Sequence, residues 1–228
     1  MTIAFLFIPS AFAEARNIQD GRLVLIVPEL FTTQDEKDVV RAMDEGMKAV
    51  EDFLGKGKEK VTVRVYARTG DFTIANRVPW WVGGMLVGSE IQIQPVGVLK
   101  RKQILASTLT HEYAHLVMRE ITGERGPKWL QEGTAVYLAG EFSGEPSKLL
   151  SWETLEKKIA RPFRDRDSAF KAYREARSIV GYLVTTYGRE KYLNLLANMR
   201  VGDDLGTAMR KAFGKGSKEV QADFLQNS

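Results

Sequence analysis

The sequence predicts an α+β fold, in which a small mixed sheet with one long helix precedes a mainly helical C-terminal lobe. Before Lys100, apolar residues occur in short or alternating runs that are typical of strands; beyond it, they recur at helical spacing. With 228 residues, of which 44% are hydrophobic, the chain can bury a core in one domain of two lobes. We expect residues 14–99 to form the α/β lobe and residues 100–228 the helical lobe.

Three short runs predict the strands. Residues 22–27 are mostly apolar, as in a strand buried on both faces, whereas residues 61–65 and 90–94 alternate apolar and polar side chains, as half-buried strands do. Between the first two runs, residues 33–53 carry apolar side chains at helical spacing after a Thr-Gln-Asp-Glu start that has the form of a capping box. Gly55 is suited to end this long helix.

The two histidines of the chain lie in one His-Glu-x-x-His motif, formed by His111, Glu112 and His115. Histidines four residues apart on a helix project from one face, so both can bind one metal while Glu112 leans over a water beside it. Residues 100–121 have helical apolar spacing, and Gly123 follows as a stop. The motif predicts a metal-dependent hydrolase. The alternative is a structural histidine pair beside a solvated glutamate.

A catalytic zinc takes three protein ligands and keeps one position for water or substrate. The chain has no third histidine and no cysteine, so a carboxylate must complete the set. Glu132 is the candidate, because Pro127 is suited to open a second helix and Glu132 follows about one turn later. Gly133 predicts a close approach between this helix and the histidine helix. The alternative is that Glu132 is an ordinary exposed helix carboxylate.

The His-Glu-x-x-His motif and the later Trp-Leu-Gln-Glu-Gly segment (residues 129–133) together resemble the gluzincin metallopeptidases. The likeness is closest to the small bacterial peptidase MA-like domains, which are distant relatives of the zinc aminopeptidases. It implies a zincin-like fold with Zn²⁺ bound by His111, His115 and Glu132. It also implies hydrolysis of peptide bonds through a metal-activated water, with Glu112 as the general base.

The resemblance extends to residues 168–183, which are similar to the helix on which the aminopeptidases carry a tyrosine that stabilises the transition state. This implies that Tyr173 donates to the developing oxyanion. Tyr182 and Tyr187 are the alternatives, since a tyrosine in a helical apolar stripe is most often a core residue. Ser168 is suited to cap this helix.

Two departures from the relatives limit what the resemblance implies. The aminopeptidases bind the substrate amine with a glutamate in a Gly-x-Met-Glu-Asn strand, whereas Leu86 stands at that position here. The resemblance therefore does not distinguish an endopeptidase from an exopeptidase. Thermolysin-like enzymes have an aspartate four residues after the third ligand, where this chain has Val136. The residues that orient the histidines are accordingly not identified by the sequence.

Residues 84–92 precede the motif and are expected to form an edge strand along the cleft. In folds of this type such a strand pairs with an extended peptide through main-chain hydrogen bonds. Gly84 and Met85 are therefore the expected substrate-binding residues, and the local glycines permit close approach. The alternative is an ordinary hairpin with glycine turns.

The formal net charge of +4 is mildly basic, and its lysines and arginines are interleaved with acids along the chain. A solvated surface explains this pattern better than a nucleic-acid groove. We expect a peptide or protein substrate, no nucleic-acid partner and no integral membrane span. The oligomeric state and the side-chain preference are not predicted by the sequence.

Residues 1–13 are apolar and end in Ala-Phe-Ala, which is the form of a signal peptide, or its remnant, although the usual basic start is missing. The run is too short to cross a bilayer as a helix. A first buried strand is the alternative. A signal peptide would direct the protein to the periplasm or outside the cell; without one we expect it in the cytoplasm.

Three classes of function therefore remain open. The favoured one is an active zinc metallopeptidase. The second is a catalytically silent zinc- or peptide-binding relative with the same fold, and the third is a basic surface-binding protein with an accidental motif. The intact Glu112 favours the enzyme, because a site that only binds metal does not need a base.

Overall fold

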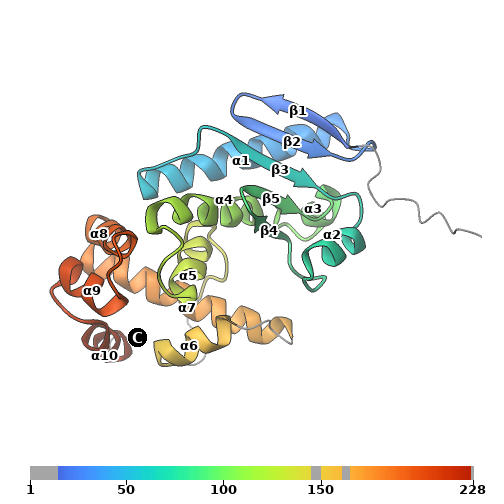
Figure 1. Ribbon diagram of the computed structural model, residues 1–228. Helices are drawn as coiled ribbons and strands as arrows, with labels where there is room; N and C mark the ends of the chain where they lie inside the picture. The colour runs from blue at the N-terminus through green and yellow to red at the C-terminus, as the bar shows by residue number, and fades with distance from the viewer. Residues whose placement is uncertain (1–14, 145–149, 161–164, 227–228) are drawn as a thin grey trace, which may run out of the picture.

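The fold has two parts that meet along one central helix. The computed structural model describes residues 15–144, 150–160 and 165–226, so the apolar run of residues 1–13 lies outside the described part. Figure 1 shows the sheet and the long helix α1 on one side of α4, with α5–α10 on the other. The mixed α+β prediction is confirmed, with the sheet in the first part and helices in the second.

The sheet has the strand order β1-β2-β3-β5-β4 and is mixed. The central pairs β2–β3 and β3–β5 are parallel, whereas β1–β2 and β4–β5 are antiparallel. Within the described sheet, β4 is therefore an edge strand with one unpaired side. The predicted edge strand over residues 84–92 is too long, because the chain turns at Gly88 and returns as β5; the alternative, a hairpin with a glycine turn, is what the structure has. The strands are β1 (Arg16–Asp20), β2 (Leu23–Val27), β3 (Val61–Val65), β4 (Gly84–Val87) and β5 (Glu90–Ile93).

The long helix α1 (Thr33–Leu54) packs on α4 (Leu105–Thr122) and holds it in place. Thr32 caps α1, because its hydroxyl accepts the Asp35 N–H at 3.0 Å, so the capping box begins one residue before the predicted one. Gly46 permits the close approach of the two helices, since a Cβ there would lie 2.6 Å from Thr110 Oγ1. The buried apolar side of α1 faces the core that it shares with the strands and α4.

The predicted helix over residues 100–121 is divided in the structure. A short helix, α3 (Val96–Arg101), ends first, and the chain turns at Gln103, whose φ is +57°. α4 then begins at Leu105 and ends at Gly123 in the left-handed conformation, as predicted. The His-Glu-x-x-His motif consequently lies in the interior of α4.

Two elements escaped the sequence analysis. Strand β1 is polar and almost fully exposed, so it has no apolar alternation to reveal it. Helix α2 (Thr69–Asn76) buries only Phe72, so it has no apolar stripe. Both elements owe their conformation to neighbours in the fold rather than to a local pattern.

The second part is helical throughout its described residues. α5 packs against both α4 and the long α7, which runs below α5 in Figure 1. Its helices are α5 (Lys128–Leu138), α6 (Trp152–Ile159), α7 (Arg166–Tyr187), α8 (Arg189–Arg200), α9 (Leu205–Phe213) and α10 (Ser217–Gln226). Within the described residues, no helix combines the length and the apolar character that a bilayer crossing requires.

Two local predictions for this part are wrong. Asp165, not Ser168, caps α7, because its carboxylate accepts the Ser168 N–H at 2.8 Å while the Ser168 hydroxyl donates to it. Gly133 permits close approach to α7 rather than to the histidine helix. A Cβ at Gly133 would lie 2.5 Å from the Ala176 carbonyl oxygen, so the backbones of α5 and α7 nearly touch there.

Candidate active site

The structure brings His111, His115 and Glu132 together from α4 and α5. The two histidine Nε2 atoms are 3.1 Å apart, and each lies 3.4 Å from Glu132 Oε2. Ligand atoms at about 2.0–2.2 Å from a tetrahedral zinc are about 3.3 Å from one another. The three side chains therefore have the spacing that a tetrahedral zinc ion requires.

Glu141 is a further site residue, which the sequence analysis missed. Its Oε2 lies 3.0 Å from His111 Nδ1. A hydrogen bond from Nδ1 to this carboxylate leaves the Nε2 lone pair of His111 directed at Glu132 and His115, which is the tautomer that a metal needs. Glu141 is therefore placed where it could orient the ring of His111.

A tight turn after α5 aims Glu141 at His111. Gly140 and Phe142, on either side of it, have φ values of +67° and +50°, and the Glu141 N–H donates to the Val136 carbonyl at 3.1 Å. The left-handed conformation is uncommon for phenylalanine and marks a backbone held by its surroundings. A glutamate beside a glycine just past the third-ligand helix was the available sequence signal, but loop conformation decides where such a carboxylate points.

The charges of the site favour a cation between the histidines and the glutamates. Burial acts to lower the pKa of His111, but hydrogen bonds to Glu132 and Glu141 outweigh it and raise that pKa well above its usual value. Burial acts to raise the pKa of Glu132, but the two histidines hold it well below its usual range. The carboxylates thus stabilise positive charge where a metal would bind.

Glu112 lies beside the three ligand side chains and is almost fully buried. Burial raises the pKa of its carboxyl, and the charges of His111 and His115 act in the opposite direction. Gly84 makes room for it, since a Cβ there would lie 3.0 Å from Glu112 Cγ and 2.7 Å from Thr108 Cγ2. A carboxylate of raised pKa in a cleft is suited to accept and return a proton.

Tyr173 lines the same cleft from α7. Its pKa is raised by burial and by the nearby carboxylates of Glu132, Glu112 and Glu141, which places the phenol among the site residues. The alternatives lie elsewhere: the ring of Tyr182 packs on Phe224, and that of Tyr187 stacks on Phe213. Among the three tyrosines named by the sequence, only Tyr173 lines the cleft.

The cleft has a volume of about 930 Å³ and two chemically different ends. One end is charged and includes Arg119, whose guanidinium bonds to Glu124 and to the Gly88 carbonyl. The other end is apolar and is lined by Val82, Ile104, Phe142, Phe170 and neighbouring side chains. At the apolar end, the ring centres of Phe142 and Phe170 are 4.7 Å apart. The side chains of His111, His115 and Glu132 line the same cleft.

Strand β4 borders the cleft, with Gly84 beside Thr108 and its far end beside Arg119. The Gln94 N–H donates to the Gly83 carbonyl at 2.9 Å, and hydrogen-bonded pairs alternate along an antiparallel ladder. The backbone groups of Gly84 and Leu86 therefore face the unpaired side. Those of Met85 face β5, and the Met85 side chain is 36% exposed.

Comparison with known proteins identifies the family of the chain. No curated protein matches the chain. A family model described as the peptidase MA superfamily matches residues 42–226, which include the histidine motif, Glu132, Glu141 and Tyr173. The match covers well over half of the chain, which therefore belongs to the peptidase MA superfamily.

Proposed function

We propose that this peptidase MA protein is a zinc-dependent metallopeptidase of the gluzincin type. The observation that carries the proposal is the spacing of 3.1–3.4 Å among the ligand atoms of His111, His115 and Glu132. That spacing fits zinc, and the buried base Glu112 and the peptide-sized cleft lie beside it. The family match supports peptidase activity as such.

When bound, zinc would supply a Lewis acid that polarises the peptide carbonyl and makes water a better nucleophile near neutral pH. Glu112 takes the proton from the attacking water and returns it to the leaving amine. Its burial and raised pKa suit both transfers, because the proton must be held between the two steps. Glu141 keeps the ring of His111 in the metal-binding orientation throughout.

In this proposal the Tyr173 hydroxyl donates a hydrogen bond to the developing oxyanion. Its raised pKa keeps the phenol protonated, so it can act as a hydrogen-bond donor at neutral pH. The ring lies 6.2 Å from that of Phe142 and nearly parallel to it, which restricts its orientation. A donor held in place costs little reorganisation when the charge develops.

The substrate in this proposal is an extended peptide paired with the free side of β4. The backbone groups of Gly84 and Leu86 provide its hydrogen bonds, and the exposed Met85 contacts its side chains. Antiparallel pairing is the stronger arrangement. β4 runs from Gly84, beside Thr108, toward Arg119, so an antiparallel peptide runs the opposite way. The residue after the cleaved bond would then lie toward the apolar end of the cleft, near Ile104 and Phe142, and we expect a large apolar side chain there.

A comparison of wild type with Glu112→Gln tests the function. Both proteins should bind one zinc per chain by elemental analysis, whereas only wild type should cleave a mixed peptide library. The exposed Glu45→Gln on α1 is the matched control and should behave as wild type. Sequencing the products gives the residue after each cleaved bond. Absence of stoichiometric zinc from wild type would overturn the proposed site.

The second candidate function is a zinc- or peptide-binding relative without catalysis, for which the cleft and the ligand spacing would serve equally well. It predicts stoichiometric zinc with no cleavage by either wild type or Glu112→Gln. We further propose export from the cytoplasm, which rests on the signal-like sequence of residues 1–13. N-terminal sequencing of the protein from cell fractions tests it, and an intact Met1 in the cytoplasm would contradict it.

A further inference from the structure

One corner of the protein combines exposed apolar side chains with unpaired cations. Helix α2 follows β3 and helix α3 follows β5, so both lie at the carboxyl end of these parallel strands (Figure 1). Ile74 on α2 is 79% exposed, and Trp80 in the turn that follows is 58% exposed. We name this surface the α2 corner; its members are Arg68, Ile74, Arg77, Trp80, Arg101 and Lys102.

The charges of the α2 corner have one sign. Its four cations are all exposed, and none of them forms an ion pair within residues 15–144, 150–160 and 165–226. Asp71 is the only acid in residues 66–81 and 95–103, while Lys100 of α3 is neutralised by Asp38. Lys102 Nζ lies 5.5 Å from the centre of the Trp80 ring, which joins the charged and apolar parts of the surface.

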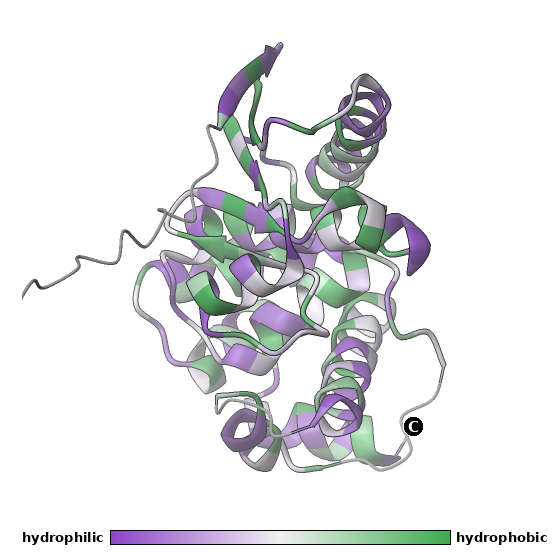
Figure 2. Cartoon of the chain, turned by 90° about the vertical axis from the view of Figure 1, so that its right-hand side faces the viewer, coloured by the Kyte–Doolittle hydropathy of each residue, from purple (hydrophilic) through white to green (hydrophobic). Residues whose placement is uncertain are grey.

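The turn that carries Trp80 is held by hydrogen bonds from a buried side chain. Gln94 is fully buried, and its side-chain amide donates to the carbonyls of Trp80 and Val82 at 2.8 and 2.6 Å. The exposed indole therefore projects from a fixed turn rather than from a loose loop. Figure 2 looks onto this end of the molecule and shows hydrophobic and hydrophilic segments interleaved.

We propose that the α2 corner docks the protein onto an anionic phospholipid surface. Arginine and lysine around exposed tryptophan and isoleucine are the chemistry that binds anionic headgroups and the acyl boundary.

Docking in this orientation brings the cleft close to the lipid surface. Val78, Pro79 and Trp81 belong to the turn that carries Trp80, and their side chains line the cleft. Peptides at or near the membrane would then reach β4 first. The inference does not depend on catalysis, because binding to lipid can be measured on protein that cleaves nothing.

Sedimentation of the full chain with lipid vesicles tests the proposal. Vesicles of phosphatidylcholine with 30% phosphatidylglycerol should bind the protein, whereas pure phosphatidylcholine should not, and added salt should weaken the binding. Each neutralised arginine is expected to weaken binding about fivefold. Arg68→Glu with Arg77→Glu should therefore reduce it at least about twentyfold, and Ile74→Ser with Trp80→Ser about tenfold.

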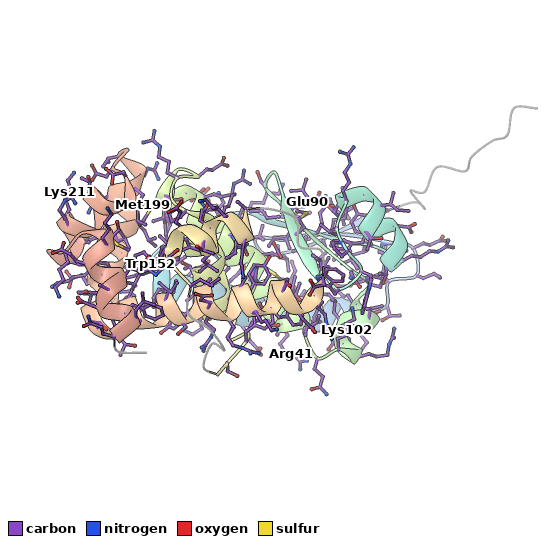
Figure 3. All side chains as sticks on the ribbon, turned by 90° about the horizontal axis from the view of Figure 1, so that it is seen from below. Arg41, Glu90, Lys102, Trp152, Met199 and Lys211 are labelled. Atoms are coloured by element: carbon purple, nitrogen blue, oxygen red, sulfur yellow. The ribbon has the colours of Figure 1, made fainter. Side chains whose placement is uncertain are left out.

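Matched changes in the other part of the molecule are the controls. Val201 is also exposed, at 76%, and Lys191 and Lys218 are exposed cations of α8 and α10. Figure 3 shows Lys211 of this helical region at the end of the molecule opposite Lys102. Val201→Ser and the pair Lys191→Glu with Lys218→Glu should leave vesicle binding unchanged, and every variant keeps residues 1–13.

Three results would overturn the proposal. Equal binding to both vesicle types removes the charge argument. Equal loss in the control and corner variants shows that net charge, not this surface, is responsible. Weaker cleavage of a protein substrate by the Ile74 and Trp80 variant, with vesicle binding unchanged, would make the corner a protein-docking surface instead. A blue shift of tryptophan emission on adding anionic vesicles, lost in Trp80→Ser, supports lipid contact independently.

Discussion

The two halves of the candidate site are assembled in different ways. His111, Glu112 and His115 come from one helix, so the geometry of α4 alone brings them together. Glu132 and Tyr173 come from α5 and α7, and only the packing of these helices places them opposite α4. The first half therefore depends on local structure, whereas the second depends on how closely two helices approach.

The largest effect is expected where α5 and α7 nearly touch. Gly133→Ala would place a Cβ 2.5 Å from the Ala176 carbonyl oxygen, so the backbones must separate. We expect a loss of about 3 kcal/mol in the free energy of unfolding, together with weaker zinc binding, because Glu132 is the adjacent residue. Urea unfolding and zinc titration measure the two losses.

Gly181→Ala is the matched control on α7. A Cβ there meets Tyr137 at an ordinary contact distance of 3.7 Å, and alanine favours helix by up to about 1 kcal/mol. Unchanged or increased stability is therefore expected. If both variants lost the same stability, the close contact at Gly133 would not be what positions the second half.

Removing the phenol of the second half should affect catalysis without affecting assembly. Tyr173→Phe keeps the ring and its packing beside Phe142, so stability and zinc binding should be unchanged. We expect kcat to fall about 100- to 1,000-fold, the usual cost of losing one oxyanion donor, with little change in KM. Tyr182→Phe is the control, since that ring packs on Phe224, and a similar fall there would reassign the donor.

The same contrast explains what could be predicted from the sequence. The ligand set follows from spacing along two helices, and the resemblance to gluzincins adds the chemistry. Glu141 could not be found in this way, because its direction depends on the left-handed backbone of Gly140 and Phe142. Helical periodicity also cannot tell which neighbour a glycine contacts, so Gly133 was assigned to the wrong helix.

At the level of the fold, the elements with a regular apolar pattern were predicted and those without one were not. Strands β2, β3 and β5 bury every second side chain, and helix α1 buries the side chains of one face. Strand β1 and helix α2 have almost no buried side chains of their own. Their conformation is imposed by pairing and by turns, which are long-range effects.

Glu141 provides a smaller test of the second half. Glu141→Gln keeps the size of the side chain but removes the charge that faces His111 Nδ1. We expect zinc to bind about 10- to 100-fold more weakly, as is usual when such an orienting partner is lost. Competition with a chelator of known affinity measures the change. Glu124→Gln, on the cleft rim beside Arg119, is the control and should bind zinc as wild type does.

The smallest expected effect concerns Glu175, which lies on α7 close to Tyr173 in sequence but is not among the residues that line the cleft. Its side chain is 2% exposed and accepts the Leu150 N–H, and burial raises its pKa above the usual value. A raised carboxyl pKa means that the folded state holds the proton more tightly. The contribution of Glu175 to stability is therefore fully present below the unfolded pKa of about 4.3 and is lost as the pH rises through the folded pKa.

Glu175→Gln removes this titration while keeping an oxygen that can accept the Leu150 N–H. The variant should match wild type at low pH and become the more stable protein as the pH approaches 7, with zinc binding unchanged. Urea unfolding at several pH values measures the difference. A variant that matches wild type at low pH but is the less stable protein at pH 7 would show that the fold stabilises the charged form of Glu175, contrary to this prediction.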